Sequence, residues 1–393
     1  MIKKILYFLL ALVFKLIPRN KHLWITGKAS EWVNGSVPPA FFDNSKYFFL
    51  YLVNFTSEKV YWLSSSKEEI KMLKKMGLPV VKFPSFRGIF LTLRAKYSFH
   101  HYGTDQINSI LQRGSVQLDF WHGTPLKKIR YDVVGKPQKK KRLLRDLISK
   151  GDIEYVFSTS CHLSEKILSN AFDVNICQLL NFGYPRMDVL KLKDNKNLAF
   201  CEKYSPELMR YIEKAQKYNN VLLYMPTFRD DDPNYFEKSG IDYNRLSKKL
   251  KDIDGVIFLK LHPLTNHISL EGFDNIIQID NSVDIYPFLI YTDFLITDYS
   301  SIYFDYLVLN KEIIFVPYDY DNYIKHRELY FDYDSITPGI KYKSFEEFID
   351  NFDNLRDLDY SSDRKKVMEL LYDDYDYNSC ERTYEFIKAK YQS

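Results

Sequence analysis

The sequence predicts an α/β protein built from two doubly wound parallel domains. Short apolar runs alternate with helical patterns over most of the 393 residues, and this alternation is typical of parallel sheets with crossover helices. The length suits two domains of ordinary size. A charged, glycine-free stretch from about residue 194 to 219 lies between two sets of apolar runs, and we expect it to be a helical connection between the domains.

The predicted strands fall into one set before that connection and one after it. We expect an N-terminal helix over 1–20, a first domain over 21–200 and a second domain over 201–393. The first domain is predicted to hold strands at 22–27, 59–64, 79–83, 96–101, 115–122, 155–160 and 176–183. The second is predicted to hold strands at 220–227, 255–263, 275–280, 293–298 and 312–319.

The N-terminal stretch MIKKILYFLLALVFKLIPRN contains an apolar run from Ile5 to Ile17, interrupted by Lys15. As a helix it would be roughly 20 Å long, which is too short for a bilayer core of about 30 Å. Lys3 and Lys4 precede it, as in a signal peptide, but no small-residue cleavage site follows. We expect a helix that lies on a membrane surface. A first core helix and a signal or anchor segment are the alternatives.

Composition and motifs exclude several classes of protein. The chain is 46% hydrophobic and 27% charged, with a net charge of +4, as in a mostly soluble protein. Its four cysteines are scattered without zinc or redox spacing, which favours a reducing cytoplasm. Neither a G-x-x-x-x-G-K-S/T loop nor a G-x-G-x-x-G fingerprint occurs, so neither an ATPase loop nor a dinucleotide site is indicated.

Polar side chains gather where five predicted strands end. Doubly wound sheets bind ligands beyond the carboxyl ends of their strands, so two histidines, two arginines, a lysine and two serines there predict a cationic pocket for a pyrophosphate. Each residue alone also has a structural explanation, such as a buried histidine, an ion pair or a helix N-cap. The residues are Trp121, His122, Gly123, Thr124, Pro125, Arg186, Asp188, Thr227, Arg229, Lys260, His262, Asp298, Ser300, Ser301 and Asp305.

The motifs around these residues, in this order, resemble one known family. They are FWHGTPLK, FGYPRMD, YMPTFR, KLHP, DYSSIYFDY and VPYDYDNY, over about residues 119–323. They resemble the CDP-glycerol glycerophosphotransferase family of teichoic-acid and capsule polymerases and primases. The resemblance implies a GT-B-like architecture, with two Rossmann-like domains facing a cleft. It also implies transfer of glycerol phosphate from CDP-glycerol to an acceptor hydroxyl, with release of CMP.

Residue roles follow from the resemblance. His122 resembles the catalytic base, and His262 resembles a second essential histidine near the donor phosphates. The implied donor-binding residues are Trp121, Gly123, Thr124, Pro125, Arg186, Thr227, Arg229, Lys260, Ser300, Ser301 and Asp305. No cofactor or metal site is implied, and the acidic runs at 229–233 and 372–378 are interpreted as turns. The family often has Arg-Gly-Phe where this chain has RELYFDY and Pro-Gly-Pro where it has PGI, which bears on the identity of the polyol.

Three other functions compete with this interpretation. CDP-ribitol could replace CDP-glycerol as the donor. A UDP-sugar glycosyltransferase of GT-B type is more distant, and a non-catalytic lipid-binding or scaffolding protein is the rival of another class. A panel of nucleotide donors would separate them.

Residues 127–150 carry ten Lys or Arg against two Asp. With the apolar N-terminus, this run supplies the two signals that stable peripheral membrane attachment needs; a solvated helix is the alternative. We therefore expect a protein on the cytoplasmic face of the cell membrane, contacting anionic lipid. Its expected acceptor is an undecaprenyl-diphosphate-linked or polymeric glycan. Nucleic acid is not expected, because no recognition motif accompanies the charge.

Overall fold

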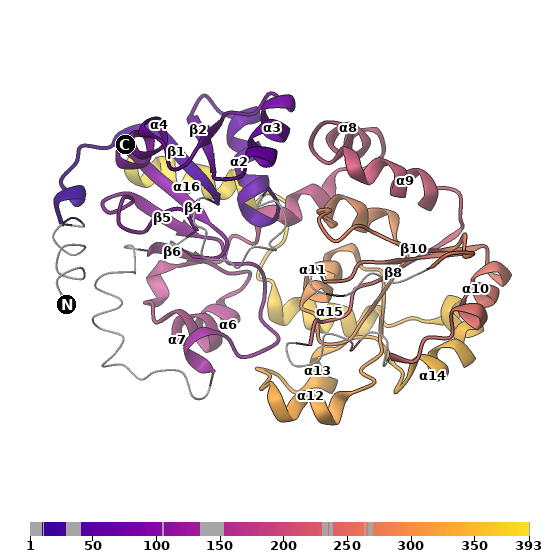
Figure 1. The fold of residues 1–393 in the computed structure, drawn as a ribbon. Coiled ribbons are helices and arrows are strands. Elements are labelled where there is room, and N and C mark those ends of the chain that lie inside the picture. The colour runs from indigo at the N-terminus through magenta and orange to yellow at the C-terminus, as the bar shows by residue number, and fades with distance from the viewer. Residues whose placement is uncertain are drawn as a thin grey trace. The chain divides into compact units, whose positions relative to one another are not determined.

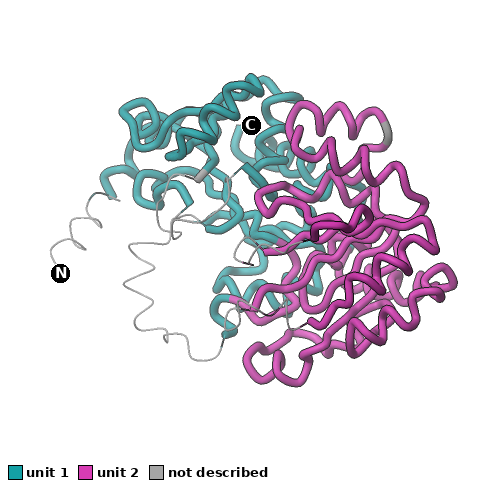
Figure 2. Tube along the Cα trace, turned by 45° about the vertical axis from the view of Figure 1, so that its right-hand side comes forward, with its two compact units in different colours: residues 1–122, 130–189, 373–393 teal, residues 123–129, 190–372 magenta. Residues whose placement is uncertain are grey.

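The computed structural model describes residues 10, 12–28, 41–103, 106–133, 153–229, 235, 239–262, 265 and 270–392. The chain forms two compact units (Figure 2). The first unit comprises residues 1–122, 130–189 and 373–393, and the second comprises residues 123–129 and 190–372. The chain therefore leaves the first unit near Val189 and returns to it at Asp373, rather than dividing once near residue 200.

In the described residues, the first unit holds a seven-stranded parallel sheet in the order β3-β2-β1-β4-β5-β6-β7. The strand order reverses between β1 and β4, and doubly wound sheets bind their ligands beside such a reversal. The strands are β1 (Asn20–Lys28), β2 (Lys59–Ser64), β3 (Val80–Lys82), β4 (Ala95–His100), β5 (Val116–Asp119), β6 (Ile153–Phe157) and β7 (Leu179–Leu180).

The second unit repeats this arrangement with six parallel strands among its described residues, in the order β10-β9-β8-β11-β12-β13. Here β8 and β11 flank the reversal. The strands are β8 (Asn220–Tyr224), β9 (Gly255–Leu259), β10 (Ile276–Gln278), β11 (Phe294–Thr297), β12 (Glu312–Phe315) and β13 (Ile340–Lys341). The predicted pair of parallel sheets is confirmed.

Helices cover both sheets (Figure 1). In the first unit they are α2 (Asp43–Phe55), α3 (Lys67–Lys75), α4 (Phe86–Arg94), α6 (Cys161–Leu163), α7 (Ser169–Phe172) and α16 (Ser379–Tyr391). In the second they are α8 (Asp194–Tyr204), α9 (Met209–Ala215), α10 (Tyr243–Asp252), α11 (Ile302–Tyr306), α12 (Tyr320–His326), α13 (Tyr333–Ile336), α14 (Phe345–Asp350) and α15 (Ser361–Leu371). The predicted helical connection corresponds to α8 and α9.

Local sequence explains these elements. Strands β8, β9 and β11 are buried along their whole length and are apolar except for Asn220 and Thr297, as expected where helices cover both faces of a parallel sheet. Several helices begin at a side chain that accepts a backbone N–H of the first turn. Ser66, Ser85, Asp242 and Ser344 cap α3, α4, α10 and α14 in this way.

The last helix, α16, belongs to the first unit, where Figure 1 shows it in yellow beside the violet strands. The carboxylate of Asp188 accepts the N–H groups of Ser379 and Cys380, at 3.0 and 2.8 Å, and so holds the start of this helix. Lys388 pairs with the buried Glu58 at 2.8 Å near its end. These contacts explain why the C-terminal residues complete the first sheet's unit.

The two membrane signals predicted from the sequence fall mainly outside the described residues. These are the apolar N-terminal helix, of which residues 1–9 and 11 are not described, and the basic run, of which residues 134–150 are not described. Within the described ranges, no helix combines the length and the apolar character needed to cross a membrane.

Candidate active site

The turn after β5 places His122 at the edge of the first sheet. Asp119 ends β5 and is fully buried, and its Oδ1 accepts the backbone N–H of Trp121 at 3.0 Å. Asn44 donates from its side chain to the carbonyl oxygen of Trp121 at 2.8 Å. Trp121 has a φ of 57° and Gly123 a φ of 122°. The two hydrogen bonds therefore hold Trp121 in a left-handed conformation that is uncommon for a bulky residue.

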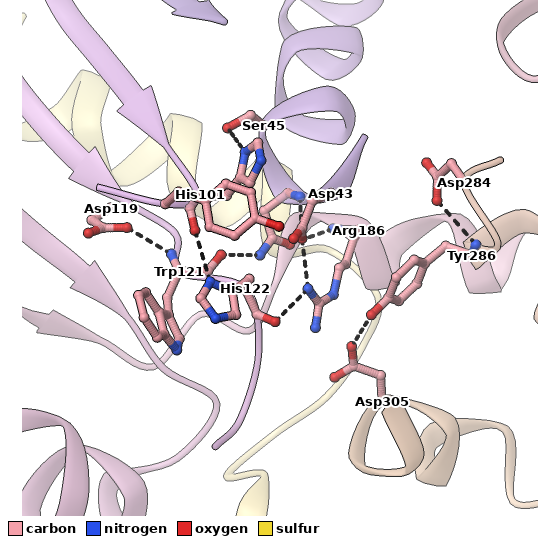
Figure 3. Close-up of polar contacts among 12 residues, drawn as sticks. Asp43, Ser45, His101, Asp119, Trp121, His122, Arg186, Asp284, Tyr286 and Asp305 are labelled. Atoms are coloured by element: carbon pink, nitrogen blue, oxygen red, sulfur yellow. Dashed lines mark hydrogen bonds and ion pairs between the residues drawn. The ribbon is translucent and has the colours of Figure 1, made fainter. Parts of the chain in front are cut away.

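The hydrogen bonding of His122 identifies its neutral tautomer. Its Nδ1 lies 3.3 Å from the carbonyl oxygen of His101 (Figure 3). A carbonyl can only accept, so Nδ1 carries the proton and Nε2 keeps its lone pair. Burial lowers the pKa of His122 to about 4, although Asp43 and the bond to His101 act in the opposite direction. The ring is therefore a neutral base at physiological pH.

Arg186 joins the loop of His122 to the start of α2. Its Nη1 donates to Asp43 Oδ1 at 2.7 Å and to the carbonyl oxygen of His122 at 2.8 Å (Figure 3). Its backbone N–H donates to Asn44 Oδ1 at 3.1 Å. Burial alone would raise the pKa of Asp43, but Arg186 and the two nearby histidines outweigh it and the pKa is lowered. The structure thus places Arg186, predicted as a donor ligand, in a buried ion pair that supports the base.

A cavity of about 710 Å³ opens in the second unit, beyond the carboxyl ends of its strands. We call it the second-unit pocket. Five of the predicted site residues line it: Thr227, Arg229, His262, Ser300 and Ser301. The sequence-based assignment missed the other lining residues, which are Lys127, Lys128, Ile129, Pro226, Phe228, Asp319, Asn322, Tyr323, His326 and Arg327. Several of these residues belong to the basic run at 127–150 or to the VPYDYDNY motif, so the sequence did point to the segments that hold them.

Arg229 is the centre of a buried network in this pocket. It donates to Asp319 from Nε at 2.8 Å and from Nη2 at 2.9 Å, and to Asp298 Oδ2 from Nη2 at 2.9 Å. Its Nη1 donates to the carbonyl oxygen of Thr227 at 2.6 Å. The Tyr299 and Tyr323 rings stack on each other, with centroids 3.8 Å apart, and each centre lies 4.9 Å from the guanidinium carbon. The network fixes the exits of β8 and β11.

His262 and Lys260, which follow β9, have different surroundings. The His262 ring stacks on Phe228 with centroids 4.5 Å apart, and its pKa is lowered by burial and by the nearby Lys260 and Lys127. Lys260 instead donates to the carbonyl oxygens of Asp280 and Asn281, at 2.9 and 2.8 Å. Lys260 is not among the lining residues, so in this structure it anchors the 280–281 loop.

The DYSS segment presents two hydroxyl groups. Ser301 is the N-cap of α11 but its side chain makes no capping bond. Among the described residues, neither Ser300 nor Ser301 uses its hydroxyl in a hydrogen bond, and both line the pocket. Asp305 is fully buried in α11 and accepts the hydroxyl of Tyr286 at 2.6 Å (Figure 3). The serines are available to a ligand, whereas Asp305 lies inside the unit's core.

The residues next to the base are divided between the units. Trp121 is buried in the first unit, and its ring lies 4.8 Å from the guanidinium of Arg130. Gly123, Thr124 and Pro125 belong to the second unit, where none of them lines the pocket. Thr124 is 1% exposed, so its side chain packs inside the protein.

Acidic side chains in the described ranges do not form a group of three that could hold a metal ion. In the run at 372–378, Asp373 accepts the N–H of Cys161 and Asp376 pairs with Arg382 at 2.7 Å. Residues 230–232 of the other acidic run lie outside the described part of the chain.

Comparison with known proteins places these sites in a family context. Over residues 34–389 the chain matches the family described as CDP-glycerol:poly(glycerophosphate) glycerophosphotransferase. A teichoic acid glycerol-phosphate transferase of Staphylococcus aureus is 30% identical over 305 residues, 76% of this chain and 76% of that protein. A teichoic acid poly(glycerol phosphate) polymerase of Staphylococcus epidermidis is 36% identical over 235 residues, 56% of this chain but only 31% of that longer protein.

A solved structure of the wall teichoic acid polymerase TagF has the same GT-B-like fold, with a TM-score of 0.75 at 23% identity. The match covers 99% of this chain and 95% of that one. Family membership rests on the sequence match, which includes every residue of the two sites described above. The chain belongs to the CDP-glycerol:poly(glycerophosphate) glycerophosphotransferase family.

Proposed function

We propose that this chain transfers glycerol phosphate from CDP-glycerol to a hydroxyl group of a teichoic acid acceptor and releases CMP. The observation that carries the proposal is the tautomer of His122, a neutral imidazole with a free Nε2 lone pair at a strand exit. The family match and the names of the relatives support the reaction class. The second-unit pocket supplies cations and free hydroxyls of the kind that bind a diphosphate.

In the proposed step, the acceptor oxygen forms a bond to the β-phosphorus of the donor while its proton moves to His122 Nε2. The bond between the β-phosphorus and the bridging oxygen breaks, and that oxygen leaves as part of CMP. Phosphoryl transfer depends mainly on positioning and on stabilising charge. Ser300, Ser301 and His262, which line the second-unit pocket, would orient the donor phosphates.

The proposal is tested by CMP release from the purified full-length protein. CDP-glycerol, CDP-ribitol and UDP-sugars are each offered with a lipid-linked acceptor extract. We expect CMP release from CDP-glycerol. Ribitol is the second candidate, because a teichoic acid ribitol-phosphate primase of Bacillus spizizenii is 27% identical over 71% of this chain and 70% of its own length. Release of UDP, or no turnover with any donor, would reject the proposal.

The pH dependence of the reaction tests the state of His122. Because burial lowers its pKa to about 4, the base stays unprotonated well below the ordinary histidine value. Measured between about pH 3 and pH 8, kcat/KM is expected to have its acid limb near pH 4, not near pH 6.5. Circular dichroism at each pH checks that the protein is folded. An acid limb near pH 6.5 would show that His122 is not buried in the working enzyme.

We also propose that the protein is peripheral at the cytoplasmic face of the membrane and that its acceptor is a polymeric or undecaprenyl-diphosphate-linked glycan. Leu12, Val13 and Leu16 in the N-terminal segment are 48%, 58% and 83% exposed. Arg19 ties this segment to the first unit by donating to the carbonyl oxygens of Phe14 and Thr92. Exposed leucines on a fixed segment support contact with lipid. Co-sedimentation with anionic vesicles, compared with Leu16→Asp, tests this proposal.

A further inference from the structure

Arg229 has little positive charge left to offer a ligand of the second-unit pocket. This guanidinium pairs with both Asp298 and Asp319, so the three side chains together carry one positive and two negative charges. Four of its N–H···O contacts already go to these carboxylates and to Thr227. A diphosphate bound in this pocket therefore needs a cation besides Arg229.

Lys127 is held in the pocket by its backbone. Residues 126–128 lie antiparallel to residues 328–330. Lys127 pairs with Leu329, the N–H of Lys128 donates to the Glu328 oxygen at 2.9 Å, and the N–H of Tyr330 donates to the Leu126 oxygen at 2.9 Å. This pairing lies wholly within the second unit. It fixes a lysine on the pocket wall without any contribution from the lysine's own side chain.

The side chains of Lys127 and Lys128 differ in their partners. Lys128 Nζ pairs with Glu328 at 3.1 Å. Lys127 Nζ lies 5.9 Å from the centre of the Tyr323 ring and, among the described residues, has no carboxylate within ion-pair distance. Burial lowers the pKa of Lys127 to about 8, with Arg327 and Arg229 acting in the same direction and Asp298 against them. Removing an ammonium group from water without pairing it to an anion costs free energy. An anionic ligand bound to Lys127 would lower that cost.

We propose that Lys127 is a direct ligand of the donor's diphosphate and that it makes the pocket prefer a nucleoside diphosphate over a monophosphate. The inference rests on the proposed function, since it takes the donor to be a CDP-polyol. CMP lacks the β-phosphate of the donor, so the product does not offer the group that Lys127 would contact. The lysine therefore strengthens donor binding more than product binding and favours release of CMP after transfer.

The test is calorimetric titration of CDP, CMP and cytidine into the full-length wild-type protein and its Lys127→Met variant. We expect the variant to bind CDP roughly 10- to 100-fold more weakly, the scale of one charge-assisted hydrogen bond. CMP binding should change by less than about threefold on the same scale. Lys325→Met is the matched control and should bind CDP like the wild type, because this lysine of α12 is exposed and does not line the pocket. Lys127→Arg should restore part of the loss.

The outcomes separate this inference from the proposed function. Unchanged CDP binding by Lys127→Met, with a wild type that binds CDP, overturns the lysine's role and leaves the proposed function standing. Equal losses for CDP, CMP and cytidine would show a structural effect and would also overturn it. A wild type that binds no cytidine nucleotide removes both proposals. Thermal unfolding of each variant checks that the protein is folded.

Discussion

Replacing His122 by alanine is expected to lower kcat by about 10²–10⁴-fold, the usual contribution of a general base. Donor binding should stay within about twofold, because every described residue that lines the second-unit pocket lies outside the first unit. The measurement is the rate of CMP release at saturating CDP-glycerol, together with calorimetric titration of CDP. A loss in kcat without a loss in binding would identify His122 as acting on the reaction itself.

The control for this variant is His162→Ala, which removes another imidazole of the first unit, in α6, and should keep full turnover. His122→Ala with wild-type turnover would show that the base assignment is wrong. His122→Ala with equal losses in kcat and in CDP binding would point to a disturbed fold rather than to lost proton transfer.

Replacing Arg229 by alanine is expected to destabilise the second unit by about 3–5 kcal/mol, the cost of leaving a buried charge without its partner. Asp298 is fully buried, and the side chain of Asp319 is 21% exposed. Both lose their shared cation in this variant. The predicted readout is faster amide hydrogen exchange in β8 and β11, the two strands whose exits this network joins.

The positions of the four tryptophans allow the two units to be followed separately. Trp24, Trp32, Trp62 and Trp121 all precede residue 123, so tryptophan fluorescence follows the first unit while hydrogen exchange follows the second. Arg245→Ala is the control, because its pair with Asp350 is 45% and 55% exposed and should contribute less than about 1 kcal/mol. Equal exchange in the Arg229 and Arg245 variants would contradict the predicted role of the buried network.

The strands could be predicted from the sequence because buried parallel strands are continuous apolar runs. Each of the twelve predicted runs overlaps a strand, for example at Val221 to Tyr224 in β8. Strand β13 was not predicted, because its two residues, Ile340 and Lys341, are too few to give a periodic signal. The return of α16 to the first unit could not be predicted either, because it depends on long-range contacts such as those of Asp188.

The site was predicted less completely, because strand exits fix where a residue is but not where its side chain points. Lys260 and Asp305 follow the right strands, yet one is bonded to backbone carbonyls and the other is buried. Asp43 was missed. The run Asp43–Asn44–Ser45 signals a helix start, but nothing in the pattern indicates that Asp43 has a φ of 59° and pairs with Arg186.

The division of the chain between its units limits how the protein can be taken apart. Along the chain, assignment to a unit changes after His122, after Ile129, after Val189 and after Tyr372. Neither unit is therefore one continuous stretch of sequence. A gene fragment ending at residue 189 would lack α16, and one beginning at residue 190 would lack Lys127. Exchanging one whole unit between relatives would therefore need joins at all four of these positions. A single cut in the gene cannot separate the two sites together with the units that hold them.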